Sequence, residues 1–116
     1  MKIKHYKDVS PTLFNNDMAK NVAGRVMIGK DDGAPHFCMR VFELGESGHT
    51  PIHTHEWEHE IFVHSGQGAV FDNGTWIDVV PGTAVFIPGN VAHQIKNTGN
   101  VPLIVVCLVP AGVPEL

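Results

Sequence analysis

Histidine is the residue type through which this sequence most directly indicates chemistry. His53, His55 and His59 fall within seven residues, and a fourth candidate, His93, lies further along the chain in a separate turn and strand region. Neutral imidazole is the commonest protein ligand for metal ions. The cluster therefore predicts a site for one divalent transition metal, held by His53, His55, His59 and His93.

Part of the cluster also matches the H-E-x-x-H motif of zinc proteases, in the order His55-Glu56-Trp57-Glu58-His59. That motif requires a helix, whereas Pro51 precedes the string and the strand-forming residues 61–63 follow it. In a strand, His53 and His55 leave the same face, and His59 follows a short turn. We therefore expect a hairpin, and not a protease helix, to bring the three rings together.

Short strands separated by glycine and proline turns are expected over most of the chain. They are predicted at residues 22–28, 36–43, 61–63, 69–71, 75–80, 83–87, 92–96 and between Pro102 and Pro110, with a loop at 45–51. Asn73-Gly74 provides the two positive φ angles that a type I′ hairpin turn needs. No window shows sustained helical periodicity. The pattern predicts an all-β antiparallel sandwich or barrel.

Composition limits the classes of partner. The chain has 116 residues, 43% of them hydrophobic and 17% charged, with a net charge of −4, and we expect one domain over 1–116. Scattered lysines and arginines argue against a nucleic-acid partner. The longest apolar run, Leu103–Val109, is too short to span a membrane. Residues 1–14 lack the apolar core of a signal peptide, so we expect a cytoplasmic protein with reduced Cys38 and Cys107.

Two motifs, at about residues 48–66 and 82–97, resemble the paired motifs of the cupin family. The first contains Gly48, His53, His55, His59 and Gly66. The second contains Gly82, Pro88, Asn90, His93 and Asn97. The chain is similar to small bacterial single-domain cupins with a four-histidine site, some of which bind manganese. The resemblance implies a jelly-roll barrel (an antiparallel double-stranded β-helix) that often forms a homodimer by exchanging an N-terminal strand.

The sequence departs from the family pattern at three places. The spacer from Gly48 to His53 is one residue short, and Asn90 replaces a glycine, which is tolerable because asparagine visits the left-handed region. Where the family has a glutamate, this chain has His59. Glu60 is an alternative ligand at a longer spacing. We favour His59 because Glu60 has the opposite strand parity and only His59 keeps the six-residue step to Gly66.

The walls of a binding pocket follow from strand parity. Ile61 and Val63 share the face of His59, Ile95 shares the face of His93, and Val105 and Cys107 share one face of the last strand. These five side chains are expected to line a pocket, with plain core packing or an inert buried thiol as the alternative.

Three charged residues have two interpretations each. Arg40 is either a pocket residue that anchors a carboxylate or enolate or a solvent-exposed residue, and exposure is favoured because arginine is rarely buried unpaired. Glu56 and Glu58 either accept hydrogen bonds from the ligand rings or belong to a solvated rim. Trp57, between them, is expected to plug the loop and not to stack on a substrate.

Four neutral imidazoles would leave a divalent ion with its full positive charge. Such a site favours a small anionic or oxygen-chelating substrate. Manganese or iron is favoured, with zinc, nickel and copper as alternatives. The sequence favours an oxidoreductase of the dioxygenase type. The alternatives are a non-catalytic module that binds a small ligand or a metal, and an isomerase, lyase or cyclase that uses the metal as a Lewis acid.

Overall fold

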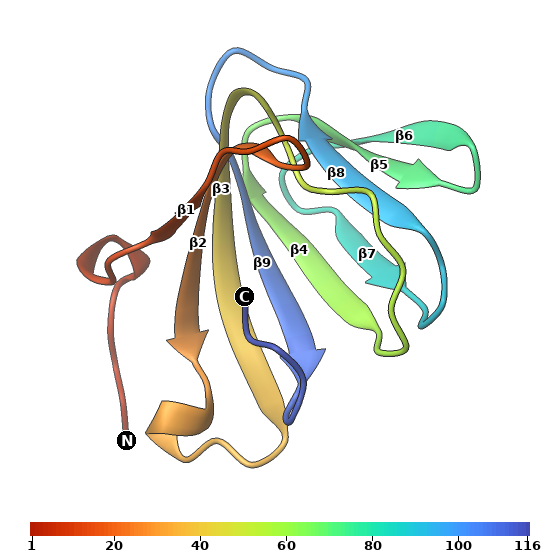
Figure 1. The fold of residues 1–116 in the computed structure, drawn as a ribbon. Helices are drawn as coiled ribbons and strands as arrows, with labels where there is room; N and C mark the ends of the chain where they lie inside the picture. The colour runs from red at the N-terminus through yellow and green to blue at the C-terminus, as the bar shows by residue number, and fades with distance from the viewer.

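Nine β-strands provide nearly all the regular structure in the computed structural model, which describes residues 1–116 (Figure 1). They are β1 (Thr12–Phe14), β2 (Lys20–Ile28), β3 (Phe37–His49), β4 (His59–Ser65), β5 (Gly68–Asp72), β6 (Thr75–Val79), β7 (Ala84–Ile87), β8 (His93–Asn97) and β9 (Leu103–Pro110). The two short 3-10 helices are η1 (Tyr6–Asp8) and η2 (Lys30–Asp32). No helix in this chain is long and apolar enough to cross a membrane.

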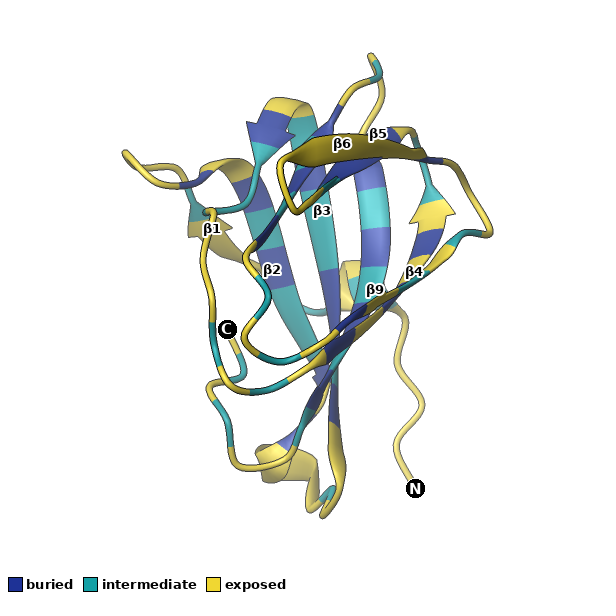
Figure 2. Ribbon diagram, turned by 90° about the vertical axis from the view of Figure 1, so that its right-hand side faces the viewer, coloured by how far each residue is buried: buried dark blue, intermediate teal, exposed yellow.

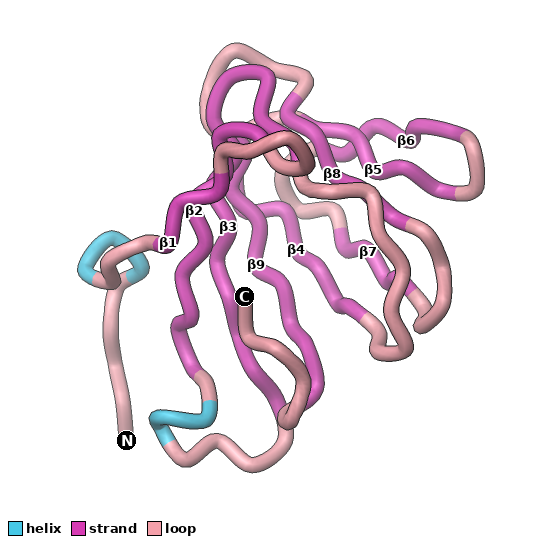
Figure 3. The backbone as a smooth tube through the Cα atoms, in the orientation of Figure 1, coloured by secondary structure: helices cyan, strands magenta, loops and turns pink.

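All strand pairs are antiparallel and belong to one curled sheet. Its hydrogen-bonded order is β6-β5-β8-β3-β9-β4-β7, with β2 paired to β3 and β1 paired to β2. The strands β2, β3, β9, β4 and β7 form one wall, and β8, β5 and β6 turn over to face it (Figures 1 and 3). The two walls are joined where His49 of β3 pairs with Lys96 of β8. The prediction of an all-β antiparallel fold is confirmed.

The turns explain much of the agreement with the sequence. Asn73 and Gly74 have φ angles of 49° and 87° and close the hairpin between β5 and β6, as predicted. Asn90 also adopts a positive φ, of 64°. The prediction of a loop at 45–51 is wrong, because β3 continues to His49, which pairs with Lys20 of β2. The small and polar residues of this stretch form a bulged strand, with Ser47 at a φ of 57°.

The core lies between the two walls of the curled sheet. In β9, every second residue is buried and the residues between them are only partly buried, so one face of the strand points inward (Figure 2). This is the period of two that a strand imposes. The core cluster consists of Val22, Leu44, Ile61, Val63, Val70, Val79, Ile87, Ile95, Leu103, Val105 and Cys107. Burial of each such valine or leucine side chain contributes about 1.5–3 kcal/mol.

Asn97, at the end of β8, ties the two walls together at the end of the barrel away from the histidines. Its side-chain nitrogen donates to the carbonyls of Leu44 and Gly45 at 3.0 Å each and of Val101 at 2.9 Å. Its side-chain oxygen accepts from the backbone nitrogen of Gly99 at 2.9 Å. These bonds fix the end of β8 against β3.

Candidate metal centre

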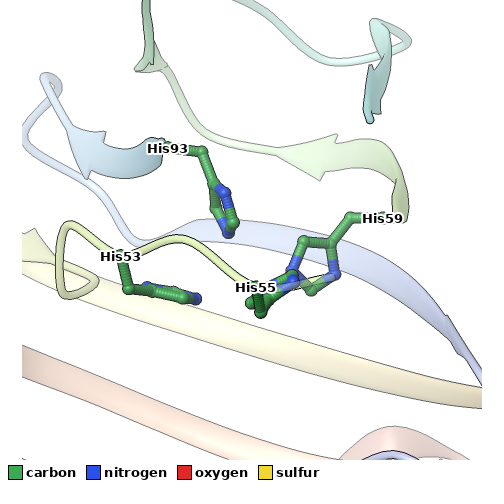
Figure 4. Close-up of side chains that lie close together, drawn as sticks. All are labelled: His53, His55, His59 and His93. Carbon is green, nitrogen blue, oxygen red and sulfur yellow. The ribbon is translucent and has the colours of Figure 1, made fainter. Parts of the chain in front are cut away.

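Four histidine side chains meet at one end of the barrel (Figure 4). His93 is the first residue of β8 and His59 the first of β4, while His53 and His55 lie in the segment between β3 and β4. The backbones of His53 and His93 exchange hydrogen bonds of 3.2 and 3.1 Å. One candidate ligand atom from each ring lies within 4.8 Å of all the others.

The route by which the rings converge differs from the expected hairpin. Only an isolated bridge to His93 holds His53 in a strand-like pairing, and residues 54–58 form no strand. The chain around His55 is instead held by a backbone hydrogen bond of 2.7 Å from Asn90 to the carbonyl of His55. A turn residue of the second motif therefore fixes a histidine of the first motif.

Backbone carbonyls orient three of the four rings. In each of these, Nδ1 lies within hydrogen-bond distance of a nearby carbonyl oxygen, so that Nδ1 carries the proton and Nε2 keeps its lone pair. The contacts are His53 to Pro51 at 3.0 Å, His55 to Trp57 at 2.7 Å and His93 to Val91 at 2.8 Å. These rings are therefore held in the tautomer that a metal ion needs at Nε2.

Burial favours the neutral form of three of the rings. It lowers the pKa of His55 and of His93, and burial together with the Arg40 guanidinium lowers the pKa of His59 to about 3. The Nε2 atom of His93 is buried without any hydrogen-bond partner. Such an orphaned atom costs about 1–3 kcal/mol, a cost that a metal ion bound among the rings would remove. The donor set of four imidazoles therefore fits a divalent transition metal.

The neighbouring carboxylates do not join the cluster. Glu60 is exposed on the opposite face of β4, and the carboxyl of Glu58 beside it raises its pKa. Neither Glu56 nor Glu58 hydrogen-bonds to a ligand ring, in contrast to the interpretation that they accept from the rings. The backbone carbonyl of Trp57 accepts the hydrogen bond from the His55 ring instead. The Trp57 ring also stacks on the His55 ring, with centroids 4.2 Å apart.

A cavity of about 290 Å³ opens beside the cluster, and His53, His59 and His93 are among the residues that line it. Eleven of its eighteen lining residues are hydrophobic. The lining includes four of the five side chains that strand parity assigned to it, namely Ile61, Ile95, Val105 and Cys107, and it also includes Arg40, for which the pocket was one of two interpretations. The fifth, Val63, does not line the cavity and lies deeper in the core, with 1% of its surface exposed.

Sequence reasoning missed the parts of the cavity wall that come from the ends of the chain. The cavity lining includes Phe14, Met18, Ala19 and Leu116. In Figure 1 the C-terminus lies in front of β3 and β9. These segments carry no regular alternation of polar and apolar residues, so parity gave no signal for them.

Arg40 is buried, and the prediction that it faces solvent is wrong. Only 6% of its surface is exposed. One terminal nitrogen, Nη2, donates to the sulfur of Cys107 at 2.9 Å and lies 3.3 Å from Nδ1 of His59, while Nη1 donates to the carbonyl of Glu115 at 3.3 Å. No carboxylate pairs with the guanidinium, since the single ion pair joins Lys2 and Asp32. Arg40 thus places a buried positive charge beside the cavity.

The fold is a curled antiparallel barrel with a four-histidine cluster that could hold a metal ion, and comparison with known proteins identifies its family. The chain belongs to the cupin family, because residues 40–109 match the family model for the cupin domain. The chain is 34% identical over 74 residues to an oxalate-binding protein of Thermotoga maritima. That match covers 60% of this chain and 61% of the relative, so it spans about three fifths of the relative's length.

Solved structures show the same fold along almost the whole chain. The polyketide cyclase RemF from Streptomyces resistomycificus superposes with a TM-score of 0.90 at 34% identity, over 98% of this chain and 82% of that one. A protein described as a predicted oxalate decarboxylase from Thermotoga maritima superposes with a TM-score of 0.83 over 95% of this chain and 99% of that one. Its identity of 23% supports the shared fold alone. The jelly-roll prediction is confirmed.

Proposed function

We propose that this cupin is a metal-dependent enzyme that closes a ring in an oxygen-rich, polyketide-like small molecule. One observation carries this proposal: three rings of the four-histidine cluster, those of His53, His59 and His93, line a cavity that is otherwise largely apolar. An apolar pocket with a few convergent polar groups is typical of a site for a small organic ligand. The similarity to a polyketide cyclase over nearly the whole chain supports this choice of substrate class.

We propose manganese or iron, in the divalent state, as the resident metal. The Nε2 atoms of His53, His55, His59 and His93 would hold it, with three of the rings already oriented by backbone carbonyls. A bound divalent ion supplies positive charge that polarises a carbonyl group and stabilises negative charge on its oxygen. Because the imidazoles are neutral, they do not cancel that charge.

The other cavity residues suit a carbonyl-rich substrate. Ile61, Ile95 and Val105 provide an apolar wall that excludes water and contacts the carbon skeleton. Arg40 adds a positive charge with no carboxylate partner, which favours an anionic group on the ligand. No aspartate or glutamate lines the cavity, so no carboxylate is available there as a general base. A ligand as small as oxalate would leave most of the cavity empty.

An oxidoreductase of the dioxygenase type is the second candidate. The observation in its favour is that the cluster opens on the cavity through three of its four rings, which leaves a face at which a substrate and dioxygen have access. The two candidates differ in one measurable respect. A dioxygenase consumes oxygen and adds its atoms to the product, whereas ring closure by condensation releases water.

The test uses metal-free protein reloaded with Mn²⁺ or Fe²⁺ and a synthetic poly-β-ketone thioester. Mass spectrometry and an oxygen electrode are read together, with chelator-treated protein as the control. We expect a metal-dependent product that has lost water, without oxygen uptake. Oxygen uptake with a product that contains two additional oxygen atoms would replace the cyclase proposal by the dioxygenase. Binding of the ketone without any turnover would contradict both enzyme functions.

A further inference from the structure

The fourth ring, that of His59, lacks the backbone acceptor that orients the other three. Its Nδ1 faces two side chains in place of a carbonyl: Nη2 of Arg40 at 3.3 Å and the sulfur of Cys107 at 3.3 Å. Those two side chains are themselves joined by a 2.9 Å hydrogen bond from Arg40 to the sulfur. All three residues are buried.

The hydrogen bonds among the rings fix where the proton of His59 lies when no metal is bound. His55 donates from Nδ1 to the carbonyl of Trp57 at 2.7 Å, so its Nε2 has a lone pair and no proton. The Nε2 atoms of His55 and His59 are 2.8 Å apart. That contact is a hydrogen bond only if Nε2 of His59 carries the proton. The Nδ1 of His59 is then an acceptor toward Arg40.

Metal binding reverses these requirements. A metal ion among the four rings needs the lone pair of Nε2 on His59, so a neutral ring must carry its proton on Nδ1. Arg40 has only donor groups and cannot accept this proton in a hydrogen bond. The sulfur of Cys107 is the remaining group within reach of Nδ1. The thiol donates its own hydrogen to the carbonyl oxygen of Leu108, which lies 4.0 Å from the sulfur.

We propose that Cys107 is a positioning residue that accepts a hydrogen bond from Nδ1 of His59 in the metal-bound protein, with Arg40 holding the sulfur in place. Metal binding then moves His59 from the tautomer protonated at Nε2 to the tautomer protonated at Nδ1. One proton leaves Nε2 and one is taken up at Nδ1, so the ring stays neutral. The sulfur fills the place that a carbonyl fills for His53, His55 and His93.

This inference rests on the proposed metal site but not on the proposed reaction. Partners that orient a metal-bound histidine typically change metal affinity by about 10- to 100-fold when they are removed. Cys38 provides a matched control, because it is the other free cysteine, is equally buried in β3, and contacts none of the four rings.

The first experiment measures Zn²⁺ affinity by competition with a chromophoric chelator for the wild-type protein and three variants. We expect Cys107→Val to bind Zn²⁺ about 10- to 100-fold more weakly. Cys107→Ser, which keeps an acceptor, should recover most of that loss, and Cys38→Val should match the wild type. Unchanged affinity in Cys107→Val, or an equal loss in Cys38→Val, would overturn the proposal. Failure of the wild type to bind any metal would instead contradict the metal site itself.

The second experiment reads the tautomer directly and does not depend on a variant that folds. Long-range ¹H–¹⁵N correlation spectra of protein labelled with ¹⁵N-histidine, with and without Zn²⁺, report which ring nitrogen carries the proton. We expect His59 to be protonated at Nε2 in metal-free protein and at Nδ1 in Zn²⁺-loaded protein, while His55 and His93 stay protonated at Nδ1 in both. A His59 that keeps its proton on Nε2 with Zn²⁺ bound would overturn the proposal.

Discussion

The two ends of β8 hold buried polar side chains with opposite properties. Asn97 has 6% of its surface exposed and uses both its nitrogen and its oxygen in hydrogen bonds to four backbone groups. His93 has 5% exposed, yet only its Nδ1 has a partner and its Nε2 has none. Both face the barrel interior on the same strand. The satisfied Asn97 side chain serves the fold, whereas the open Nε2 of His93 is an atom that the proposed metal would satisfy.

The largest effect expected from this contrast is the loss of metal binding in His93→Ala. This change removes one of the four proposed ligands, so the affinity for Mn²⁺ or Zn²⁺ should fall by more than the roughly 100-fold typical of residues that only support ligands. The metal-free protein should keep a thermal midpoint close to that of the wild type, because an unsatisfied buried atom is also removed. Elemental analysis and calorimetric unfolding measure the two quantities.

His36→Ala is the matched control, because His36 is exposed and lies outside the cluster. It should keep a full metal complement. If His93→Ala also kept its metal, His93 would not be a ligand and the contrast between the ends of β8 would be lost.

A substitution at Asn97, at the opposite end of β8, should lower the stability of the fold and not the metal affinity. Asn97→Ala leaves four backbone groups without their partner, and we expect the free energy of unfolding to fall by about 2–4 kcal/mol. Urea titration measures this as a lower midpoint at an unchanged slope. The exposed Asn100→Ala variant should change stability by less than about 0.5 kcal/mol. Loss of metal affinity in folded Asn97→Ala, without loss of stability, would contradict the structural role that we assign to Asn97.

Local patterns were sufficient to predict the all-β antiparallel class and to single out the four histidines that lie together in the structure. Alternation along β9 and the positive φ angles at Asn73 and Asn90 depend only on neighbouring residues, so the sequence determines them directly. Strand parity also separated His59 from Glu60. Parity fixes which face a side chain occupies but not its depth, however. Ile61 and Val63 share a face, yet only Ile61 reaches the cavity.

What the sequence did not predict depends on distant residues. Arg40 is stabilised in the interior by Cys107 and Glu115, which are 67 and 75 positions away. No local signal reveals such partners, so the general rule that arginine is exposed gave the wrong answer. Likewise, the rings of His53, His55 and His93 are oriented by backbone carbonyls, and every residue has a carbonyl whatever its type. Glu56 and Glu58 were the acceptors that the sequence suggested for these rings, but their side chains make no hydrogen bond to them.

The smallest effect is expected at Glu60, the residue next to His59 on the other face of β4. The Glu58 carboxyl raises the folded-state pKa of Glu60, so the folded chain holds that proton more tightly than the unfolded chain does. The resulting stability is present below the unfolded pKa and is lost as pH rises through the raised value. At pH 7 the repulsion between the two carboxylates therefore opposes folding.

Replacement by glutamine tests both the ligand assignment and this repulsion. Since Glu60 is exposed and screened by solvent, Glu60→Gln should raise stability at pH 7 by less than about 0.5 kcal/mol, and the gain should disappear below about pH 4. Metal affinity should not change, because the side chain points away from the four rings. Urea titrations at both pH values and a Zn²⁺ titration give the answer. A clear fall in affinity would place Glu60 among the ligands and His59 outside them, because the two residues lie on opposite faces of one strand.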